Sequence, residues 1–197
     1  MPKLKIFTYP DVVLSQKARP IERVEKSYYR LADNMLETMY EAPGVGLAAN
    51  QVGILERLLV IDTDYELIDL EELKEGEALP PGGEVTNGQL ILGKKPIIVI
   101  NPEIIYREGK TSISEACLSV PDYRAEVARA EKIKLQYQDI DGLTKVLSAE
   151  GLLAVCIQHE MDHLDGTLFI DRLSKLKQDF AKRKLINARK RNSARND

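Results

Sequence analysis

Residues 151–166, with the sequence GLLAVCIQHEMDHLDG, form the most informative stretch of this chain. The first part of the stretch is apolar on almost every side, which is typical of a helix that runs through a protein core. Its polar end contains His159 and His163, the only two histidines in the sequence. Because residues four apart on a helix project from the same face, both imidazoles can bind one metal ion. The stretch therefore predicts a buried helix that carries a metal site.

Glu160 lies between the two histidines, one position round the helix from the first. A glutamate at this position can reach a water molecule on the metal and act as its general base. Chance placement is the weaker interpretation, because the only histidines of the chain fall at ligand spacing with a glutamate between them. Burying Glu160, Asp162 and two histidines would also be costly unless a cation compensated them.

A catalytic metal site needs a third protein ligand and an open coordination position, and the chain has no third histidine. Asp171, Cys117 and Cys156 remain as candidates. Cys156 lies only three residues before His159, so a ligand set drawn from this one short span would be strained. Cys117 belongs to a polar segment elsewhere in the chain and fits the geometry better as a ligand from a separate element. The residues alone leave the choice open.

The bulk composition describes an ordinary globular protein. Apolar residues make up 44% and charged residues 30% of 197 residues, which predicts one domain over residues 1–197 with a real hydrophobic core. The net charge of −3 does not indicate DNA or membrane binding by the protein as a whole. No apolar run approaches the ~20 residues that span a bilayer, so we expect no membrane association and a cytoplasmic location. With two cysteines, a disulfide scaffold is not expected.

Periodicity predicts the other elements of the fold. Apolar residues at four-residue intervals, among them Leu31, Met35 and Met39, predict an amphipathic helix over residues 22–41. Strand patterns bounded by breakers cover residues 55–64, 95–105, 131–139 and 144–150, the last two as a hairpin. Helices and strands are segregated rather than alternating, which favours an α+β fold over a doubly wound sheet.

Residues 65–95 are acidic at first and then rich in proline, glycine and asparagine. Such a composition cannot bury much apolar area, so we predict an excursion on the protein surface. Residues 172–197 form a basic tail with ten lysines or arginines and only two acids. The three-and-four spacing of Leu173, Leu176 and Phe180 predicts that its first half docks as an amphipathic helix while the rest is solvated.

Residues 44–51, GVGLAANQ, fit the loose dinucleotide-binding pattern, with Asp62 or Asp64 as the acid that would bind a ribose. That function requires a strand immediately before Gly44. The pattern before Gly44 is helical instead, and Pro43 intervenes. We therefore expect this loop to bind something other than a nucleotide.

Three motifs in this order, GVGLAANQ, EACLS and QHEMDHLDG, resemble the signature motifs of the peptide deformylases. The resemblance also takes in YPDVVL, INPEI and the hairpin, so it covers residues 6–174. It implies mainly antiparallel sheets packed around a central metal-binding helix, with an N-terminal and a C-terminal helix. It further implies that the metal ligands are Cys117, His159 and His163, and that Glu160 is the catalytic acid and base.

The resemblance also implies a substrate, a metal and further roles. The substrate would be the N-formylmethionyl end of a nascent peptide, which releases formate on hydrolysis. Gln51 would donate its side-chain amide, and Leu118 its backbone N–H, to the developing oxyanion, while Gly46 would bond the peptide backbone. Fe(II) would be the physiological metal, and a thiolate and imidazole set is also compatible with zinc or nickel. The basic tail would contact the ribosome through RNA phosphates.

The methionine side chain of such a substrate needs an apolar pocket. Helix positions 152, 155, 156 and 159 share one face, so this face would line the approach to the metal. The candidate residues for this pocket are Val45, Leu152, Val155 and Cys156.

Two residues depart from the family pattern. Ala116 stands where the family usually has glycine, and alanine would be strained there if the position required a positive φ. Asn50 replaces the common proline before Gln51, a change we expect to be mild. The 65–95 excursion has no clear counterpart in the shorter members. The main rival function is that of a zinc endopeptidase, which would share the two histidines and Glu160 but take a carboxylate as its third ligand.

Overall fold

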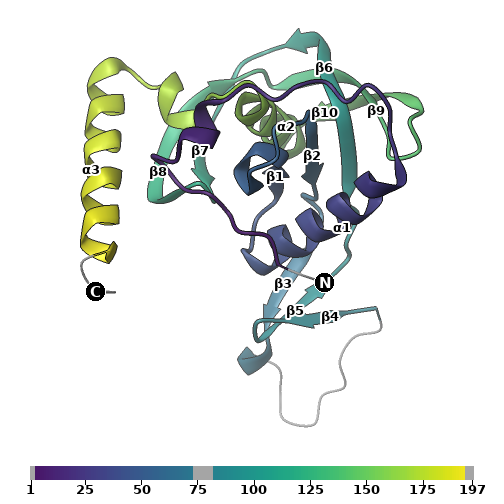
Figure 1. Ribbon diagram of the computed structural model, residues 1–197, viewed down its shortest axis with the longest axis horizontal. Helices are drawn as coiled ribbons and strands as arrows, with labels where there is room; N and C mark the ends of the chain where they lie inside the picture. Colours follow the sequence, from purple (N-terminus) through teal and green to yellow (C-terminus); the bar gives the residue numbers. More distant parts are fainter. Residues whose placement is uncertain (1–2, 73–81, 194–197) are drawn as a thin grey trace.

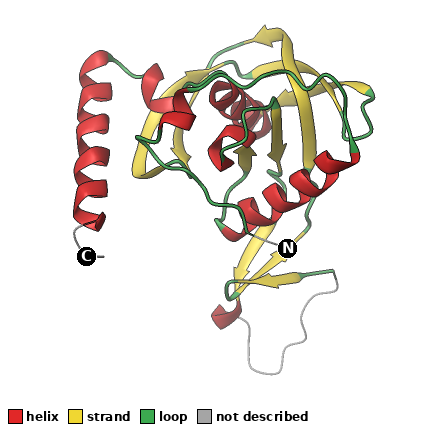
Figure 2. Ribbon diagram, in the orientation of Figure 1, coloured by secondary structure: helices red, strands yellow, loops and turns green. Residues whose placement is uncertain are grey.

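The computed structural model describes residues 3–72 and 82–193 of the chain. Helix α2 (Gly151–Leu164) lies at the centre, and antiparallel strands surround it (Figure 1). Helix α1 (Lys26–Glu41) crosses one side of this core, and helix α3 (Lys175–Ser193) stands at its edge, beside strand β8 (Val120–Arg129) (Figure 2). This arrangement confirms the predicted α+β fold with a central helix.

In the described part of the chain, ten strands form three antiparallel sheets, with orders β1-β2-β6-β9-β10, β3-β5-β4 and β7-β8. Their bounds are β1 (Gly46–Ala48), β2 (Leu58–Ile61), β3 (Glu66–Asp69), β4 (Glu84–Thr86), β5 (Gln89–Leu92), β6 (Ile97–Glu108), β7 (Thr111–Cys117), β8, β9 (Lys132–Gln138) and β10 (Thr144–Glu150). Short 3-10 helices are η1 (Val12–Ser15), η2 (Ala49–Val52), η3 (Leu70–Glu72) and η4 (Phe169–Arg172). The predicted hairpin is confirmed as β9 and β10, whose register pairs Lys132 with Glu150.

Apolar and polar residues do not alternate along strand β2, because both of its faces are buried. Leu59 and Ile61 pack in the cluster around α2, whereas Leu58 and Val60 pack in the cluster around α1. Successive side chains on a strand point to opposite faces, so a strand between two helices buries both faces. The five-stranded sheet therefore forms the wall between α1 and α2.

The periodicity predicted that helix α1 begins at residue 22, but the helix begins at Lys26. The Asn101 side chain explains the difference. Its Oδ1 accepts a hydrogen bond from the Ile21 N–H at 2.9 Å, and its Nδ2 donates one to the Ile21 carbonyl at 2.8 Å. The backbone just before the helix is thus tied to the sheet in a non-helical path.

The described residues of the excursion between β2 and β6 bury more apolar area than its composition predicted. Its described residues form the sheet β3-β5-β4, and Leu90 and Ile91 on the central strand are buried. Ile91 joins the apolar cluster around α1, so the expectation of little apolar burial is wrong for β5. The middle of the predicted excursion, residues 73–81, lies outside the described residues.

The tail forms a helix as predicted, and Leu173, just before the helix, is buried as predicted, but the prediction is wrong for Leu176 and Phe180. Leu176 and Phe180 are 82% and 65% exposed, whereas Ala181 and Leu185 are 0% and 5% exposed. Ala181 and Leu185 are four residues apart, and they pack in the apolar cluster that contains Phe169. The helix therefore docks through Ala181 and Leu185, near its middle, with Leu176 and Phe180 exposed to solvent.

Candidate metal centre and active site

One cluster of potential metal ligands joins helix α2 to the end of strand β7. His159 and His163 come from α2 and Cys117 from β7, and their ligand atoms all lie within 4.8 Å of one another. The Cys117 Sγ lies 3.1 Å from the His163 Nε2. One thiol and two imidazoles at this separation match the ligand chemistry of a catalytic metal site with three protein ligands.

The chemistry of the two imidazoles also suits a metal ion. Burial lowers the pKa of His163 well below its ordinary value, which favours the neutral form that binds metals. Burial acts in the same direction on His159, but hydrogen bonds with Cys117 and Glu115 outweigh it and hold the pKa of His159 well above its usual value. A carboxylate partner makes a histidine a more basic ligand and fixes its ring orientation.

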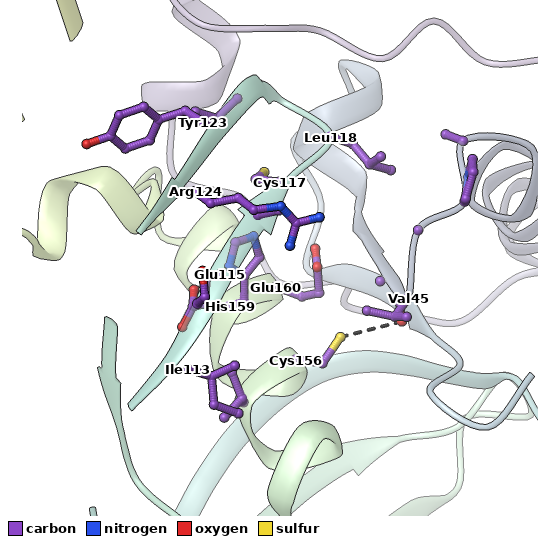
Figure 3. A pocket seen from close by; sticks show the side chains of 18 of the residues that line it. Val45, Ile113, Glu115, Cys117, Leu118, Tyr123, Arg124, Cys156, His159 and Glu160 are labelled. Atoms are coloured by element: carbon purple, nitrogen blue, oxygen red, sulfur yellow. Dashed lines mark hydrogen bonds and ion pairs between the residues drawn. The ribbon is translucent and has the colours of Figure 1, made fainter. Parts of the chain in front are cut away.

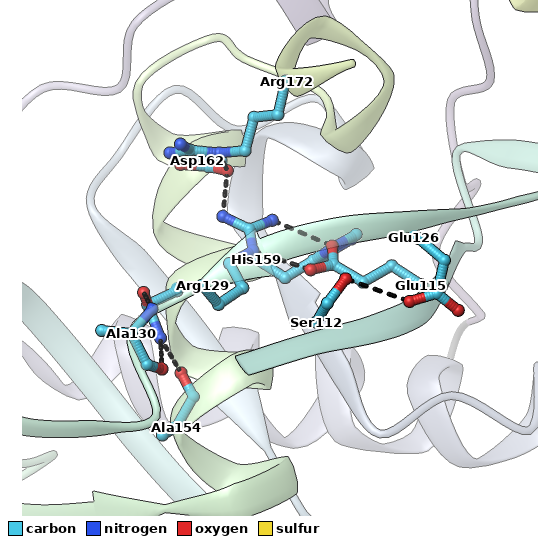
Figure 4. Close-up of polar contacts among 10 residues, drawn as sticks. Ser112, Glu115, Glu126, Arg129, Ala130, Ala154, His159, Asp162 and Arg172 are labelled. Atoms are coloured by element: carbon cyan, nitrogen blue, oxygen red, sulfur yellow. Dashed lines mark hydrogen bonds and ion pairs between the residues drawn. The ribbon is translucent and has the colours of Figure 1, made fainter. Parts of the chain in front are cut away.

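That carboxylate partner is Glu115, whose Oε2 lies 2.7 Å from the His159 Nδ1. Because this bond occupies the Nδ1, the Nε2 of His159 remains available to bind a metal ion. Arg129 holds Glu115 with two hydrogen bonds of 2.7 and 2.9 Å, and it reaches the Asp162 carboxylate at 2.6 Å (Figure 4). Arg172 donates to the same Asp162 carboxylate from the protein surface. Arginine side chains, rather than a metal cation, therefore compensate Asp162, which corrects the expectation from the sequence.

Replacing Arg129 with methionine is expected to destabilise the fold by about 3–5 kcal/mol, because the buried Glu115 and Asp162 carboxylates would lose a shared counter-charge. Urea unfolding followed by circular dichroism measures the change. The control is Lys132→Met, which removes an exposed partner of Glu150 and is expected to cost less than about 1 kcal/mol. Equal losses in the two variants would contradict the role of Arg129 in balancing the buried charges.

Glu160 is buried next to the ligand cluster. Burial raises the pKa of Glu160 to about 7, and its Oε2 has no hydrogen-bond partner in the described part of the chain. A carboxylate with a pKa near neutrality and a free oxygen is suited to take up and return a proton. Gly46 makes room for it, because a Cβ at Gly46 would lie only 2.5 Å from the Glu160 Oε1.

Gln51 is buried with its amide held in one orientation. Its Oε1 accepts a hydrogen bond of 2.8 Å from the Ala48 N–H, which directs the Nε2 to the other side. The Nε2 donates to the Ser119 hydroxyl at 3.1 Å and lies 3.6 Å from the Cys117 Sγ. The amide N–H groups of Gln51 therefore point toward the ligand cluster.

An open pocket of about 940 Å³ lies over the cluster (Figure 3). Ten of the residues singled out from the sequence line it, namely Val45, Gly46, Gln51, Cys117, Leu118, Leu152, Val155, Cys156, His159 and Glu160. His163 is fully buried behind them. The pocket is large enough for a peptide end and mixes apolar walls with a few polar groups, as ligand sites do.

The two alternative third ligands lie elsewhere. Asp171 accepts a hydrogen bond from the Leu168 N–H at 3.0 Å and pairs with Lys182 at 2.7 Å. The Cys156 Sγ lies 3.4 Å from the Val45 carbonyl, on the pocket wall rather than in the ligand cluster. Of the three candidates, only Cys117 joins the histidines.

The two departures from the family pattern have structural answers. Ala116 is absent from the residues with positive φ among those described, so alanine causes no backbone strain there. Asn50 is fully buried, and its Nδ2 donates to the carbonyl oxygen of His163. A proline at this position has no side-chain donor for that contact.

The sequence analysis assigned no role to Glu115, although it begins the EACLS motif, and it did not single out Arg129. A signal for Glu115 existed, because metal-bound histidines commonly donate to a carboxylate and Glu115 lies two residues before Cys117. Arg129 carried no such signal, since it lies 14 residues from Glu115 and 33 from Asp162. Arg124 also lines the pocket, and Figure 3 shows its guanidinium turned toward the interior.

A metal ion accounts for the burial of a thiol and two imidazoles against one another, and the pocket leaves room for a substrate beside them. The fold and the site therefore define a metal-dependent hydrolase. Comparison of sequences makes this assignment specific. The family model of polypeptide deformylase matches residues 3–179, and the chain belongs to this family.

Individual relatives agree over nearly the whole chain. A peptide deformylase of Rhizobium meliloti is 44% identical over 191 residues, which cover 96% of this chain and 96% of the relative. The crystal structure of a peptide deformylase from Legionella pneumophila is 38% identical with a TM-score of 0.77, and the match covers 98% of this chain and 99% of that one. A peptide deformylase from Ehrlichia chaffeensis, solved in complex with actinonin, is 39% identical with a TM-score of 0.77 over 95% and 98% of the two chains.

Proposed function

We propose that this chain hydrolyses the N-formyl group from the N-terminal formylmethionine of newly synthesised polypeptides and releases formate. The observation that carries the proposal is the meeting of Cys117, the two histidines and Glu160 at one pocket, in a member of the polypeptide deformylase family. Because its substrates are nascent chains, we also propose a cytoplasmic location and a single catalytic domain. No helix in the described part of the chain is long and apolar enough to cross a membrane.

Cys117, His159 and His163 would hold the metal ion. The ion, when bound, supplies a Lewis acid that polarises the formyl carbonyl and makes water a stronger nucleophile. Membership of the family supports Fe(II) as the physiological ion, and the thiolate and imidazole set is equally compatible with iron, zinc and nickel. Glu115 and Arg129 would keep the His159 ring in place for this task.

Glu160 would move the proton during the reaction. Its carboxylate takes a proton from the attacking water and returns it to the amine that leaves, so that formate and a free N-terminus result. The amide of Gln51 and the backbone N–H of Leu118 would donate hydrogen bonds to the oxyanion that develops on the formyl oxygen. The bond from Ala48 to Gln51 supports this role, because it points the donor group toward the cluster in advance.

The pocket walls would select the substrate. The apolar surfaces of Val45, Leu152, Val155 and Cys156 would accept the methionine side chain, and the backbone of Gly46 would bond the peptide. Strand β1 supports the latter role. It lies at the edge of the five-stranded sheet, where an extended peptide can pair with free backbone groups.

An anaerobic assay on a formyl-methionyl peptide, with metal analysis of the same sample, tests the function and the metal together. Formate release that scales with iron content is the expected result. Absence of formate release from protein loaded in turn with iron, nickel and zinc would reject the proposed activity. Activity only in the zinc-loaded protein would retain the activity and reject iron as the physiological ion.

Helix α3 supports a contact with the ribosome. Leu176 and Phe180 are exposed on it, and its basic residues include Lys190 and Arg191 in the last turn. Apolar and basic groups together suit a surface made of protein and RNA phosphates. We propose that this helix brings the enzyme to emerging chains.

Charge reversal of Lys190 and Arg191 to glutamate is expected to weaken co-sedimentation with ribosomes at low salt. The slope of log binding constant against log salt concentration is expected to become shallower by about two. The reason is that roughly one counterion is released per phosphate contact, and two contacts are removed. The control reverses Lys132 and Lys145, which are exposed on the hairpin of β9 and β10. Unchanged binding, or an equal loss in the control, would argue against a specific contact through α3.

A further inference from the structure

The excursion between β2 and β6 has no part in the chemistry described above. None of its described residues lines the pocket. The excursion nevertheless contacts a loop that lines the pocket. This loop runs from the end of α1 to β1 and contributes Ala42, Pro43, Gly44, Val45 and Gly46 to the pocket wall. Figure 1 shows the small sheet β3-β5-β4 extending from the core beyond the C-terminal end of α1.

Two side chains of the excursion hold this loop from outside. The Tyr65 hydroxyl donates a hydrogen bond of 2.8 Å to the carbonyl of Gly44. The Asn87 Nδ2 donates one of 3.2 Å to the carbonyl of Glu41, at the last residue of α1. Asn87 and Gly88 have φ values of 47° and 80° between β4 and β5, as in a tight two-residue hairpin turn. The turn therefore presents the Asn87 side chain from a defined position.

Tyr65 is itself held in place by the core. Its ring packs edge to face on Tyr40, with ring centroids 5.0 Å apart. The Tyr40 hydroxyl donates to Asp62 at 2.6 Å, and the same Asp62 oxygen accepts the Lys95 N–H at 2.7 Å. The two ends of the excursion are thus joined at one buried carboxylate. Asp62 also donates its backbone N–H to the Val45 carbonyl at 3.0 Å.

The position of this loop matters because the space next to it is tight. A Cβ at Gly46 would lie 2.5 Å from the Glu160 Oε1, and a Cβ at Gly44 would lie 2.9 Å from the Leu118 Cδ1. A small shift of the loop would therefore change the backbone groups that it offers to a peptide.

We propose that the described residues of the 65–95 excursion form a brace for the peptide-binding loop, and that Tyr65 is a positioning residue for substrate binding through its bond to Gly44. This inference rests on the proposed function, because it assigns residues 44–46 to the bound peptide. Tyr65 touches neither the ligand cluster nor the pocket, so its effect falls on binding of the peptide rather than on proton transfer.

The test compares Tyr65→Phe with the wild-type holoenzyme. The variant keeps the ring that packs on Tyr40 and removes only the hydroxyl. KM for a formyl-methionyl peptide is expected to rise about threefold to tenfold, the effect of one net hydrogen bond, with kcat within about twofold. Amide exchange of residues 44–48 is expected to become faster. Asn87→Gly keeps the turn conformation, removes the second contact and is expected to act in the same direction.

The matched control is Tyr106→Phe, which removes a hydroxyl bonded to Glu108 on an exposed part of β6 and is expected to leave KM unchanged. An unchanged KM in active Tyr65→Phe, or a fall in kcat at constant KM, would overturn the brace. If the wild-type protein releases no formate, the proposed function fails by itself. In that case the rate of amide exchange of residues 44–48 tests the brace by itself. An unchanged exchange rate in Tyr65→Phe would overturn the proposed brace.

Discussion

Replacing Glu160 with glutamine is expected to lower kcat by a factor of about 10² to 10⁴, the range that a positioned acid and base contributes. Glutamine has nearly the same shape, so it fits the space beside Gly46, but it cannot take up a proton from water or return one to the leaving amine. The variant should retain its metal, because Glu160 is not among the three residues proposed to hold it. Steady-state formate release and metal analysis on one sample measure both effects.

The control for this variant is Glu150→Gln, which makes the same chemical change at the exposed residue just before α2. Its kcat is expected to stay within about twofold of the wild-type value, since surface changes of this kind have small effects. A Glu160→Gln enzyme with full metal content and near-normal kcat would mean that another group moves the proton.

Replacing Cys117 with serine is expected to reduce metal affinity by at least about 100-fold and formate release in proportion. Loss of a group that merely orients a ligand already costs about 10–100-fold, and here a proposed ligand itself is replaced by a weaker one. Serine is close in size, so the β7 and β8 pair that carries the residue should keep its structure. Competition with a chromogenic chelator measures affinity, and circular dichroism checks the fold.

The same substitution separates the deformylase from a zinc endopeptidase that would use a carboxylate as its third ligand. Such an enzyme would lose little metal in Cys117→Ser. Cys156→Ser is the matched control for metal affinity, because this second cysteine is buried near the site but lies outside the ligand cluster. Equal metal loss in the two variants would contradict the assignment of Cys117.

Those features of the site that depend on one local element could be predicted from the sequence. His159, Glu160 and His163 occupy a single helix, so their relative directions follow from helical geometry alone. The hairpin of β9 and β10 was predictable for the same reason, because a short turn determines which residues pair. The choice of Cys117 needed either the family motifs or the structure, since 46 residues separate it from His163.

The errors concern residues whose position depends on distant partners. Spacing alone favoured Leu176 and Phe180 as the docking face of the tail, yet Ala181 and Leu185 dock instead. Periodicity indicates which side chains share a helix face, but the surface that receives the helix decides which face is buried. The prediction that the excursion buries little apolar area was wrong for a similar reason. Its overall composition is polar, yet strand β5 packs Ile91 against the α1 cluster.

The sequence by itself therefore determined the α+β class, the helix that carries the two histidines and Glu160 and, through three motifs, the family. Only the tertiary structure decided how Glu115 and Arg129 support His159, how Gln51 is directed, and how Tyr65 reaches Gly44. The physical reason is the range of the interactions. Neighbouring residues determine the geometry of a helix or a hairpin. Buried charge pairs and braces form only when folding brings distant segments within hydrogen-bond distance.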